Sequence, residues 1–121
     1  MDGAGLGELA DEAFCYVTTT GRRSGSPHRI EIWFGARGGT LYLLAGGGRN
    51  ADWVRNVEED PEATVQIGHS VWQAAARVVT DAEEEQHARR LLASKYQGWR
   101  EGAELSGWAR TALPVALDLR P

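Results

Sequence analysis

Short runs of alternating apolar and polar residues dominate the chain, and this alternation is typical of half-buried β-strands. It is clearest in residues 28–36, which would turn Ile30 and Ile32 to one face of a strand and Glu31 and Trp33 to the other. Glycine-containing turns separate the runs, so that neighbouring runs can pair as hairpins. Six runs are therefore predicted to be strands: residues 14–20, 28–36, 40–45, 63–68, 71–80 and 113–120.

Two other segments show the spacing of three to four residues that is typical of an amphipathic helix. The first, residues 51–59, follows Asn50, which is a candidate N-cap. The second opens with a capping-box pattern at residues 80–83, runs to about residue 97 and would be stopped by the glycine that follows it. The pattern thus predicts three strands, a helix, two strands, a helix and a final strand.

This order of elements restricts the fold. It contains no regular βαβ repeat, so a Rossmann sheet is not expected. Hairpin connections favour largely antiparallel pairing. A small closed or split barrel, with the helices covering its ends, is the natural way to pack such strands.

Composition narrows the class of protein. A length of 121 residues predicts one domain, residues 1–121, whose Gly-, Ala- and acid-rich residues 1–13 would be a frayed N-terminal segment. The net charge of −4 gives no reason to expect a nucleic acid or an anionic membrane as partner. The single cysteine, Cys15, fits a reducing cytoplasm and a buried thiol. We expect no membrane insertion, because the chain has no apolar run of membrane-spanning length.

The densest candidate chemistry lies between the first two predicted strands, in the sequence TTTGRRSGSP of residues 18–27. Arginine binds phosphate through two parallel hydrogen bonds, hydroxyl groups add neutral donors, and glycine lets backbone N–H groups approach a ligand closely. A solvated turn that happens to be basic has the same composition, so the residues alone leave both interpretations open.

A second glycine-rich turn, GGGRN at residues 46–50, leads into the first predicted helix. The start of a helix has unpaired N–H groups and a positive dipole, which suit an anion, and a flexible linker is the alternative. We expect both turns to lie at the same end of adjacent strands, which would favour one shared phosphate site.

Together these stretches resemble a known family. The sequence TTTGRRSGSPHRIEIWF, followed by GGTLYLLAGGGRNADWVRNVEEDPEATVQIG, is similar to the deazaflavin (coenzyme F420)-dependent nitroreductase and quinone reductase family. The resemblance implies a homodimer with a mainly β (α+β) fold related to the pyridoxamine-phosphate oxidases: a six-stranded antiparallel split β-barrel with two helices. It also implies that one set of residues binds the cofactor: Thr20, Gly21, Arg22, Arg23, Ser24, Gly25, Gly46, Gly47, Gly48, Arg49, Asn50 and Trp53.

The sequence departs from the nitroreductase pattern in two places. The glycine-rich turn has Gly48 and Arg49 where the family commonly has a lysine. The second strand has Ile30 and Glu31 where the family often has an Asn-Pro pair. A flavin such as FMN, or no cofactor at all, therefore stays open beside coenzyme F420.

The second predicted strand also carries the candidates for catalysis. If its polar face turns toward a cleft, Glu31 would be a partly buried carboxylate with a raised pKa, as a general acid or base needs, and His28 would be the second catalytic candidate. The alternative is that Glu31 forms a surface ion pair with Arg29 or Arg77. Trp33 matches a family position that contacts substrate. No metal site is expected, because the three histidines lack ligand spacing.

Aromatic residues gather near the end of the chain. Tyr96, Trp99 and Trp108 border or lie in residues 99–112, which we expect to be irregular. By resemblance to the family this region would form a lid, with Tyr96 and Trp99 joining Trp33 as substrate contacts. Packing against the barrel or burial in a dimer interface is equally compatible with the pattern.

These observations predict an oxidoreductase that uses reduced coenzyme F420 to transfer a hydride to an electron-poor small molecule. A quinone, an enone or a nitroaromatic would be such a substrate. Two alternatives remain: the same barrel as a flavin-binding or cofactor-independent acid–base enzyme using His28 and Glu31, and a non-catalytic protein that binds a ligand in the barrel.

Overall fold

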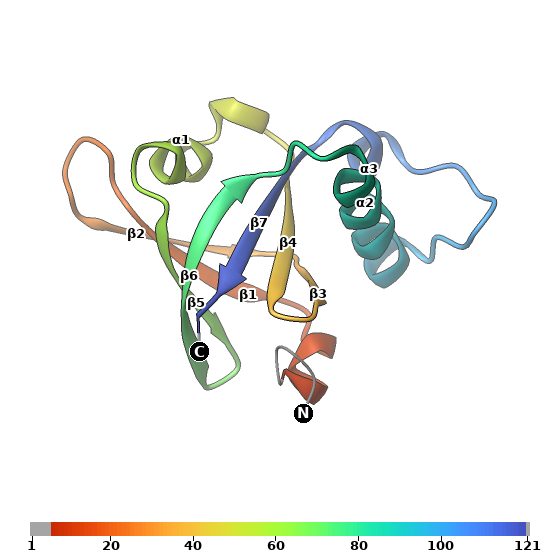
Figure 1. Cartoon of the computed structure of the whole chain (residues 1–121), viewed down its shortest axis with the longest axis horizontal. Helices are drawn as coiled ribbons and strands as arrows, with labels where there is room; N and C mark the ends of the chain where they lie inside the picture. The colour runs from red at the N-terminus through yellow and green to blue at the C-terminus, as the bar shows by residue number, and fades with distance from the viewer. Residues whose placement is uncertain (1–5, 121) are drawn as a thin grey trace.

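The computed structural model describes residues 6–120, and its central element is one seven-stranded antiparallel sheet (Figure 1). The strands are β1 (Cys15–Thr20), β2 (Pro27–Ile32), β3 (Gly35–Arg37), β4 (Thr40–Ala45), β5 (Glu62–Ile67), β6 (Ser70–Val78) and β7 (Leu113–Leu119). The helices are α1 (Asp52–Glu59), α2 (Ala82–Gln97) and α3 (Gly107–Thr111), with short 3-10 turns η1 (Gly7–Asp11) and η2 (Gly48–Asn50). The prediction of a mainly β, antiparallel fold is confirmed, but the counts of six strands and two helices were wrong.

The sheet curls because of one short connection. Its strand order is β2-β1-β5-β6-β7-β4-β3, so β2 and β3 form opposite edges. Only Trp33 and Phe34, which we call the junction, lie between these two strands along the chain. Three peptide links reach roughly 11 Å, so the sheet has to bend until its two edges meet at the junction. The result is a barrel in which the two edges of the sheet face each other along a line that we call the seam. The junction closes the barrel at one end of this seam.

The other end of the seam stays open. β3 pairs only with the first half of β4, from Thr40 to Tyr42, whereas Leu43 to Ala45 pair only with β7. Within residues 6–120, β2 pairs only with β1. Two strand edges with free backbone N–H and C=O groups therefore border the open part of the seam, which we call the split.

The predicted strand 28–36 is interrupted at the junction, and α2 supplies the reason. The hydroxyl of Tyr96 accepts a hydrogen bond from the Phe34 N–H (3.0 Å), and Lys95 Nζ donates to the Phe34 carbonyl (3.0 Å). These side chains satisfy backbone groups that a ladder partner would otherwise hold. α2 also packs against Gly35, where an added Cβ would lie 2.6 Å from Leu91 Cγ. The alternating sequence continues through the junction, but the backbone pairing does not.

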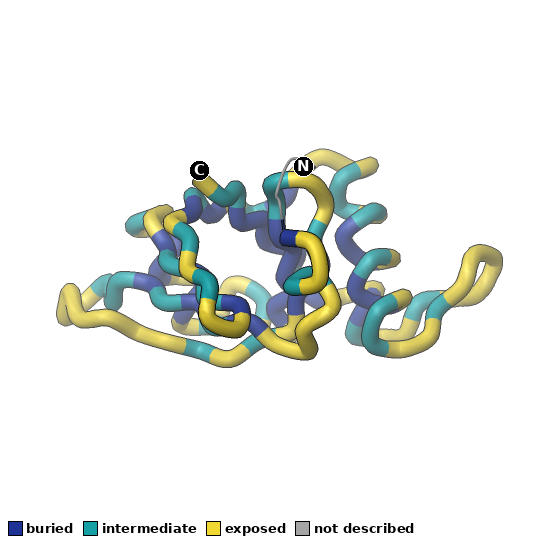
Figure 2. Tube along the Cα trace, turned by 90° about the horizontal axis from the view of Figure 1, so that it is seen from below, coloured by how far each residue is buried: buried dark blue, intermediate teal, exposed yellow. Residues whose placement is uncertain are grey.

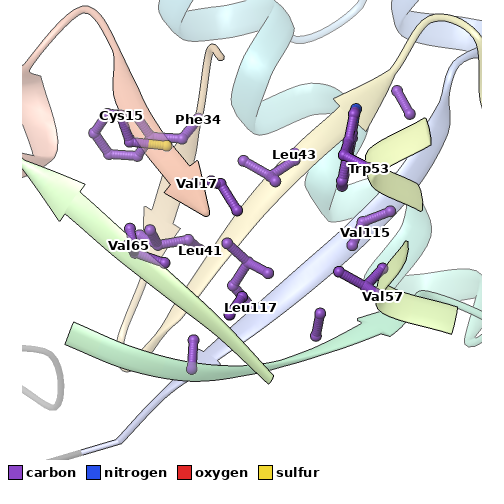
Figure 3. Packing of buried hydrophobic residues seen from close by; sticks show 14 of the residues in the cluster. Cys15, Val17, Phe34, Leu41, Leu43, Trp53, Val57, Val65, Val115 and Leu117 are labelled. Atoms are coloured by element: carbon purple, nitrogen blue, oxygen red, sulfur yellow. The ribbon is translucent and has the colours of Figure 1, made fainter. Parts of the chain in front are cut away.

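The main core fills the inside of the barrel. Val17, Leu41, Val115 and Leu117 are fully buried there, and Figure 3 shows Trp53 reaching in from α1 between β4 and β7. Trp53 is only 8% exposed, so α1 closes one end of the barrel. α2 and α3 pack on the outside of β4 and β7, which buries both faces of these strands.

The ends of the helices partly match expectation. Gly98 stops α2 in the left-handed conformation, as predicted. The two predicted N-terminal caps were wrong. Asn50 ends η2 instead of capping α1, and Asp81, not the box of residues 80–83, caps α2 by accepting from the Glu84 N–H (2.9 Å). The stretch 99–112 was expected to be irregular, but it contains α3.

Some parts of the chain lie outside the packed barrel. The turn between β1 and β2 and the segment between α2 and α3 project on opposite sides of the molecule and are largely exposed (Figures 1 and 2). Of the segment 1–13 predicted to fray, residues 1–5 lie outside the described residues, whereas Leu6 is buried in the core and Gly7–Asp11 forms η1. None of the described helices is both long and apolar enough to cross a bilayer.

Candidate functional site

The turn between β1 and β2, residues 21–26, is a tight backbone loop. The Gly21 N–H donates to the Ser26 carbonyl (2.8 Å), and the Gly25 N–H donates to the Gly21 carbonyl (2.8 Å). Gly25 has a φ of +75°, a conformation that other residues rarely adopt. Ser24 Oγ accepts from the Ser26 N–H (3.1 Å), so this hydroxyl stabilises the turn itself.

Arg22 fixes this loop to α1. Its backbone N–H and its Nη1 both donate to Asn56 Oδ1, at 3.1 and 3.0 Å, and its Nη2 pairs with Asp52 Oδ1 at 3.2 Å. Asn56 is 2% exposed and donates in turn to Thr19 Oγ1 (3.1 Å). A buried amide with these partners holds the guanidinium in one place. Arg22 is therefore a clamp between the loop and α1.

Arg23 has the opposite character. Its side chain is exposed, and in the described part of the chain no carboxylate pairs with it and no hydrogen bond engages it. It lines a cavity of about 270 Å³, the loop cavity, whose lining is Gly21, Arg22, Arg23, Ser24, His28, Asp52 and Asn56. A free guanidinium and an imidazole beside a tight turn can hold an anionic group.

The second glycine-rich turn does not join the loop cavity. Gly46 lines a different cavity, and Arg49 pairs with Glu58 of α1 beside a third one. β1 and β4 are not adjacent, because β5, β6 and β7 lie between them in the sheet. The prediction that the two turns sit on adjacent strands was therefore wrong, and it is α1 that meets the 21–26 loop. The buried Trp53 lies in the core and borders neither cavity.

A second cavity, of about 560 Å³, lies at the split and is larger than the loop cavity. Its walls come from both sides of the seam and from the helices beyond it: Phe14, Glu31, Ile32, Trp33, Leu44, Gly46, Gln97 and Trp108. We call it the aromatic cavity. Because it reaches from β2 to β4, a ligand in it would lie beside the two free strand edges.

Trp33 is the centre of this cavity's aromatic wall. It is 38% exposed and stacks face to face on Tyr96, with ring centroids 4.3 Å apart. Trp108 of α3 meets it edge to face at 5.5 Å. Tyr96 is fixed by its own hydroxyl, which donates to the Ala13 carbonyl (2.9 Å). The wall therefore presents a flat indole that is held from behind.

The three predicted substrate contacts, Trp33, Tyr96 and Trp99, do not lie together in one cavity. Trp33 lines the aromatic cavity, while Tyr96 supports it from behind and is not part of the lining. Trp99 lies elsewhere, in a small cavity of the segment after α2, where its Nε1 donates to the Ala103 carbonyl (2.7 Å). The geometry brings Trp33 together with Trp108 instead.

The structure places Glu31 and His28, the two catalytic candidates, in different cavities. Glu31 lines the aromatic cavity and His28 the loop cavity, at opposite ends of β2. Glu31 is exposed, so the partial burial expected for it was wrong. The expected ion pair with Arg29 or Arg77 is also absent among residues 6–120. The Glu31 carboxylate accepts instead from the Tyr16 hydroxyl (3.0 Å), and the pKa of Tyr16 is raised by this hydrogen bond.

Several site residues were not anticipated from the sequence. Asp52 and Asn56 hold Arg22, and Phe14 and Gln97 join Trp108 of the expected lid region in completing the aromatic cavity. An asparagine on the apolar face of an eight-residue helix is a usable signal for Asn56, because a buried amide needs partners. For Phe14 no signal separates a cavity position from an ordinary strand start.

Comparison with known proteins identifies the family of this chain. Residues 2–119 match the family described as F420H(2)-dependent quinone reductase. The chain belongs to this family. It is therefore an F420-dependent reductase, and its cofactor is coenzyme F420.

Solved structures show the same barrel in proteins of varied description. An F420-H2-dependent reductase is 21% identical, with 87% of this chain and 93% of that chain covered and a TM-score of 0.66. A protein from Listeria innocua, named provisionally as pyridoxamine 5′-phosphate oxidase, is 17% identical over 96% and 90%, with a TM-score of 0.71. The heme storage protein of Vibrio cholerae is 15% identical over 96% and 88%, with a TM-score of 0.75. At such identities these likenesses show the fold alone.

The described residues fit coenzyme F420 in this family. The loop cavity offers Arg23 and His28 to an anionic tail, and the aromatic cavity offers two free strand edges to a planar ring, which leaves the Trp33 indole for a second planar molecule. His28 and Trp33 are five residues apart, roughly 17 Å along an extended chain. A molecule with a tail at one end and a ring at the other matches this arrangement.

Proposed function

We propose that this F420-dependent reductase transfers a hydride to a planar, electron-poor small molecule bound in the aromatic cavity. A quinone, an enone or a nitroaromatic has the required shape and electron deficiency. The observation that supports this choice is the exposed indole of Trp33, stacked on Tyr96 at the centre of a largely apolar cavity at the split. A planar acceptor gains stacking area on such a surface.

The residues of this chain would bind and orient the reactants. Arg23 and His28 hold the anionic tail, and Arg22 keeps the loop that carries Arg23 against α1. The unpaired backbone groups of β2 and of residues 43–45 provide donors and acceptors for polar edges of a ring. Apolar walls exclude water from the reacting faces. When bound, the reduced deazaflavin supplies the hydride chemistry.

The proposal needs no acid from the protein. Glu31 is exposed, and its carboxylate accepts a hydrogen bond from the Tyr16 hydroxyl. His28 lies in the loop cavity, beside Arg23 rather than at the aromatic wall. Water at the mouth of the aromatic cavity can protonate the reduced product. We therefore assign His28 to tail binding.

The proposal also includes the oligomeric state of the protein and its location in the cell. One solved structure described as a domain-swapped dimer is 23% identical, with 87% of this chain and 79% of that chain covered and a TM-score of 0.68. On this basis we propose a homodimer, which sedimentation at micromolar concentration would show as twice the chain mass of 13.2 kDa. The single cysteine leads us to propose a cytoplasmic location as well.

The test combines cofactor binding with turnover. Titration should quench F420 fluorescence with a Kd below about 50 µM, equivalent to about 6 kcal/mol. The protein with reduced F420 should then reduce 1,4-naphthoquinone. Trp33→Ala should raise KM by about two- to tenfold, because aromatic stacking contributes about 0.5–1.5 kcal/mol. Trp99→Ala is the matched control and should leave KM unchanged. Absence of F420 binding would overturn the proposal. An unchanged KM in Trp33→Ala would show that the substrate does not bind on Trp33 in the aromatic cavity.

A further inference from the structure

The aromatic cavity has an unusual distribution of charge. Among the described residues that line it, seven are apolar, aromatic or uncharged, and Glu31 alone carries a charge. Glu31 is two residues before Trp33 in sequence, and both residues line the cavity in which a planar molecule would stack. Any ligand that enters the cavity therefore meets one negative charge and no positive one from this lining.

Nothing in the described part of the chain neutralises that charge. Glu31 has no ion pair there, and its hydrogen-bond donor is the uncharged Tyr16 hydroxyl at 3.0 Å. The nearest arginine in sequence, Arg29, is engaged elsewhere: its guanidinium lies over the Tyr16 ring, 4.3 Å from the centroid, and donates to Gln66 Oε1 (3.4 Å). Tyr16 thus orients the carboxylate without cancelling its charge.

We propose that Glu31 selects substrates by charge, so that the aromatic cavity accepts neutral or cationic planar molecules and rejects anionic ones. The inference rests on the proposed function, because it assigns a specificity to the same cavity. An anionic ligand loses hydration against apolar walls and meets a like charge, whereas a neutral ring loses little. Glu31 is on this view a specificity residue and not an acid or a base.

The test uses two ligands that differ in charge, 1,4-naphthoquinone and its 2-sulfonate. Dissociation constants come from quenching of tryptophan fluorescence and are measured without turnover. The wild-type protein should bind the neutral quinone at least about tenfold more tightly than the sulfonate, a difference of about 1.4 kcal/mol. The sulfonate group also makes the ring more electron-poor, so weaker binding or slower turnover of the sulfonate would not reflect poorer reactivity as an acceptor.

Glu31→Gln removes the charge while keeping an acceptor for the Tyr16 hydroxyl. In this variant the Kd of the sulfonate should fall about fivefold or more, and the Kd of the neutral quinone should stay within twofold of the wild-type value. The ratio of the two dissociation constants should no longer depend on the salt concentration. Glu59→Gln, which removes an exposed carboxylate from α1, makes the same change in net charge and should leave the ratio as in the wild type. The ratio of kcat/KM for the two quinones should change in the same direction.

Two results would overturn the inference: equal wild-type binding of the two quinones, or an unchanged ratio in Glu31→Gln. Both differ from failure of the proposed function, which would appear as missing F420 binding or missing turnover of the neutral quinone. The binding ratio is measured in either case, so the charge selection is tested even if no turnover occurs.

Discussion

The two neighbouring arginines of the 21–26 loop should respond to alanine substitution in opposite ways. Arg22 is clamped to α1 through Asn56 and Asp52, and its side chain is only 18% exposed. Arg23 is exposed and has no partner among the described residues. Arg22→Ala should therefore lower the stability of the protein itself, whereas Arg23→Ala should weaken only the binding of an anionic cofactor.

The contacts of Arg22 set the size of the effect. A hydrogen bond from a charged donor to a buried acceptor such as Asn56 Oδ1 contributes about 1.5–3 kcal/mol. The ion pair with Asp52, whose side chain is 68% exposed, contributes less than about 1 kcal/mol. Arg22→Ala should thus reduce the free energy of unfolding by about 2–3 kcal/mol, which lowers Tm by roughly 10 °C in a domain of this size.

The measurement combines urea and thermal unfolding with F420 titration, all on the same variants. Arg23→Ala should keep the wild-type Tm within about 2 °C and raise the Kd for F420 about tenfold, because one charge-assisted contact is lost. Arg22→Ala should lose stability and also bind F420 less tightly, since its loop is released. Equal stability of Arg22→Ala and the wild type would refute the clamp. A large loss of stability in Arg23→Ala would show that this residue is structural.

Two further predictions concern α2. Hydrogen bonds from Arg77 and Tyr42 hold the pKa of Glu84 at about 2, below its ordinary value of 4.5, so the stability that Glu84 contributes is present above about pH 5 and is lost as the pH falls toward 2. Unfolding titrations should show a flatter pH dependence in Glu84→Gln, and identical curves would contradict the assignment. Gly35→Ala should cost about 1–3 kcal/mol, because the new Cβ would overlap Leu91. Leu91→Ala in the same background should recover part of the loss of Tm, and an unchanged Tm in Gly35→Ala would show that α2 can move away.

Alternation predicted most of the sheet because it reports which side of a strand faces the core. The strands β1 and β4 to β7 begin and end within two residues of their predicted bounds. The junction could not be found this way. Its sequence keeps alternating, while its hydrogen bonds come from Lys95 and Tyr96, about sixty residues later in the chain. A pattern that reads local exposure carries no information about such distant partners.

The site was predictable to a similar extent. Glycine and arginine at residues 21–25 correctly marked a tight basic turn, because these residue types shape and charge a loop locally. Their separate roles depend on Asn56, 34 residues away from Arg22, and so could not be assigned. Trp108 was predicted only as part of an aromatic lid region. Its place in a helix and its contact with Trp33 were not predicted, because α3 has only five residues, too few for a period to show, although Ser106 caps it by accepting from the Ala109 N–H.

The position of the last strand has a consequence for folding. β7 is the last of the seven described strands in sequence order, yet it lies in the middle of the sheet, between β6 and β4. Before it is synthesised, β2-β1-β5-β6 and β4-β3 can form only two separate sheets, each with an exposed edge. Thr40 and Asp118, which face each other across the β4–β7 ladder, are 78 residues apart. Barrel closure is therefore a late event that depends on non-local contacts, and such topologies fold slowly. A nascent chain would hold two unfinished half-sheets until the residues of β7 emerge from the ribosome.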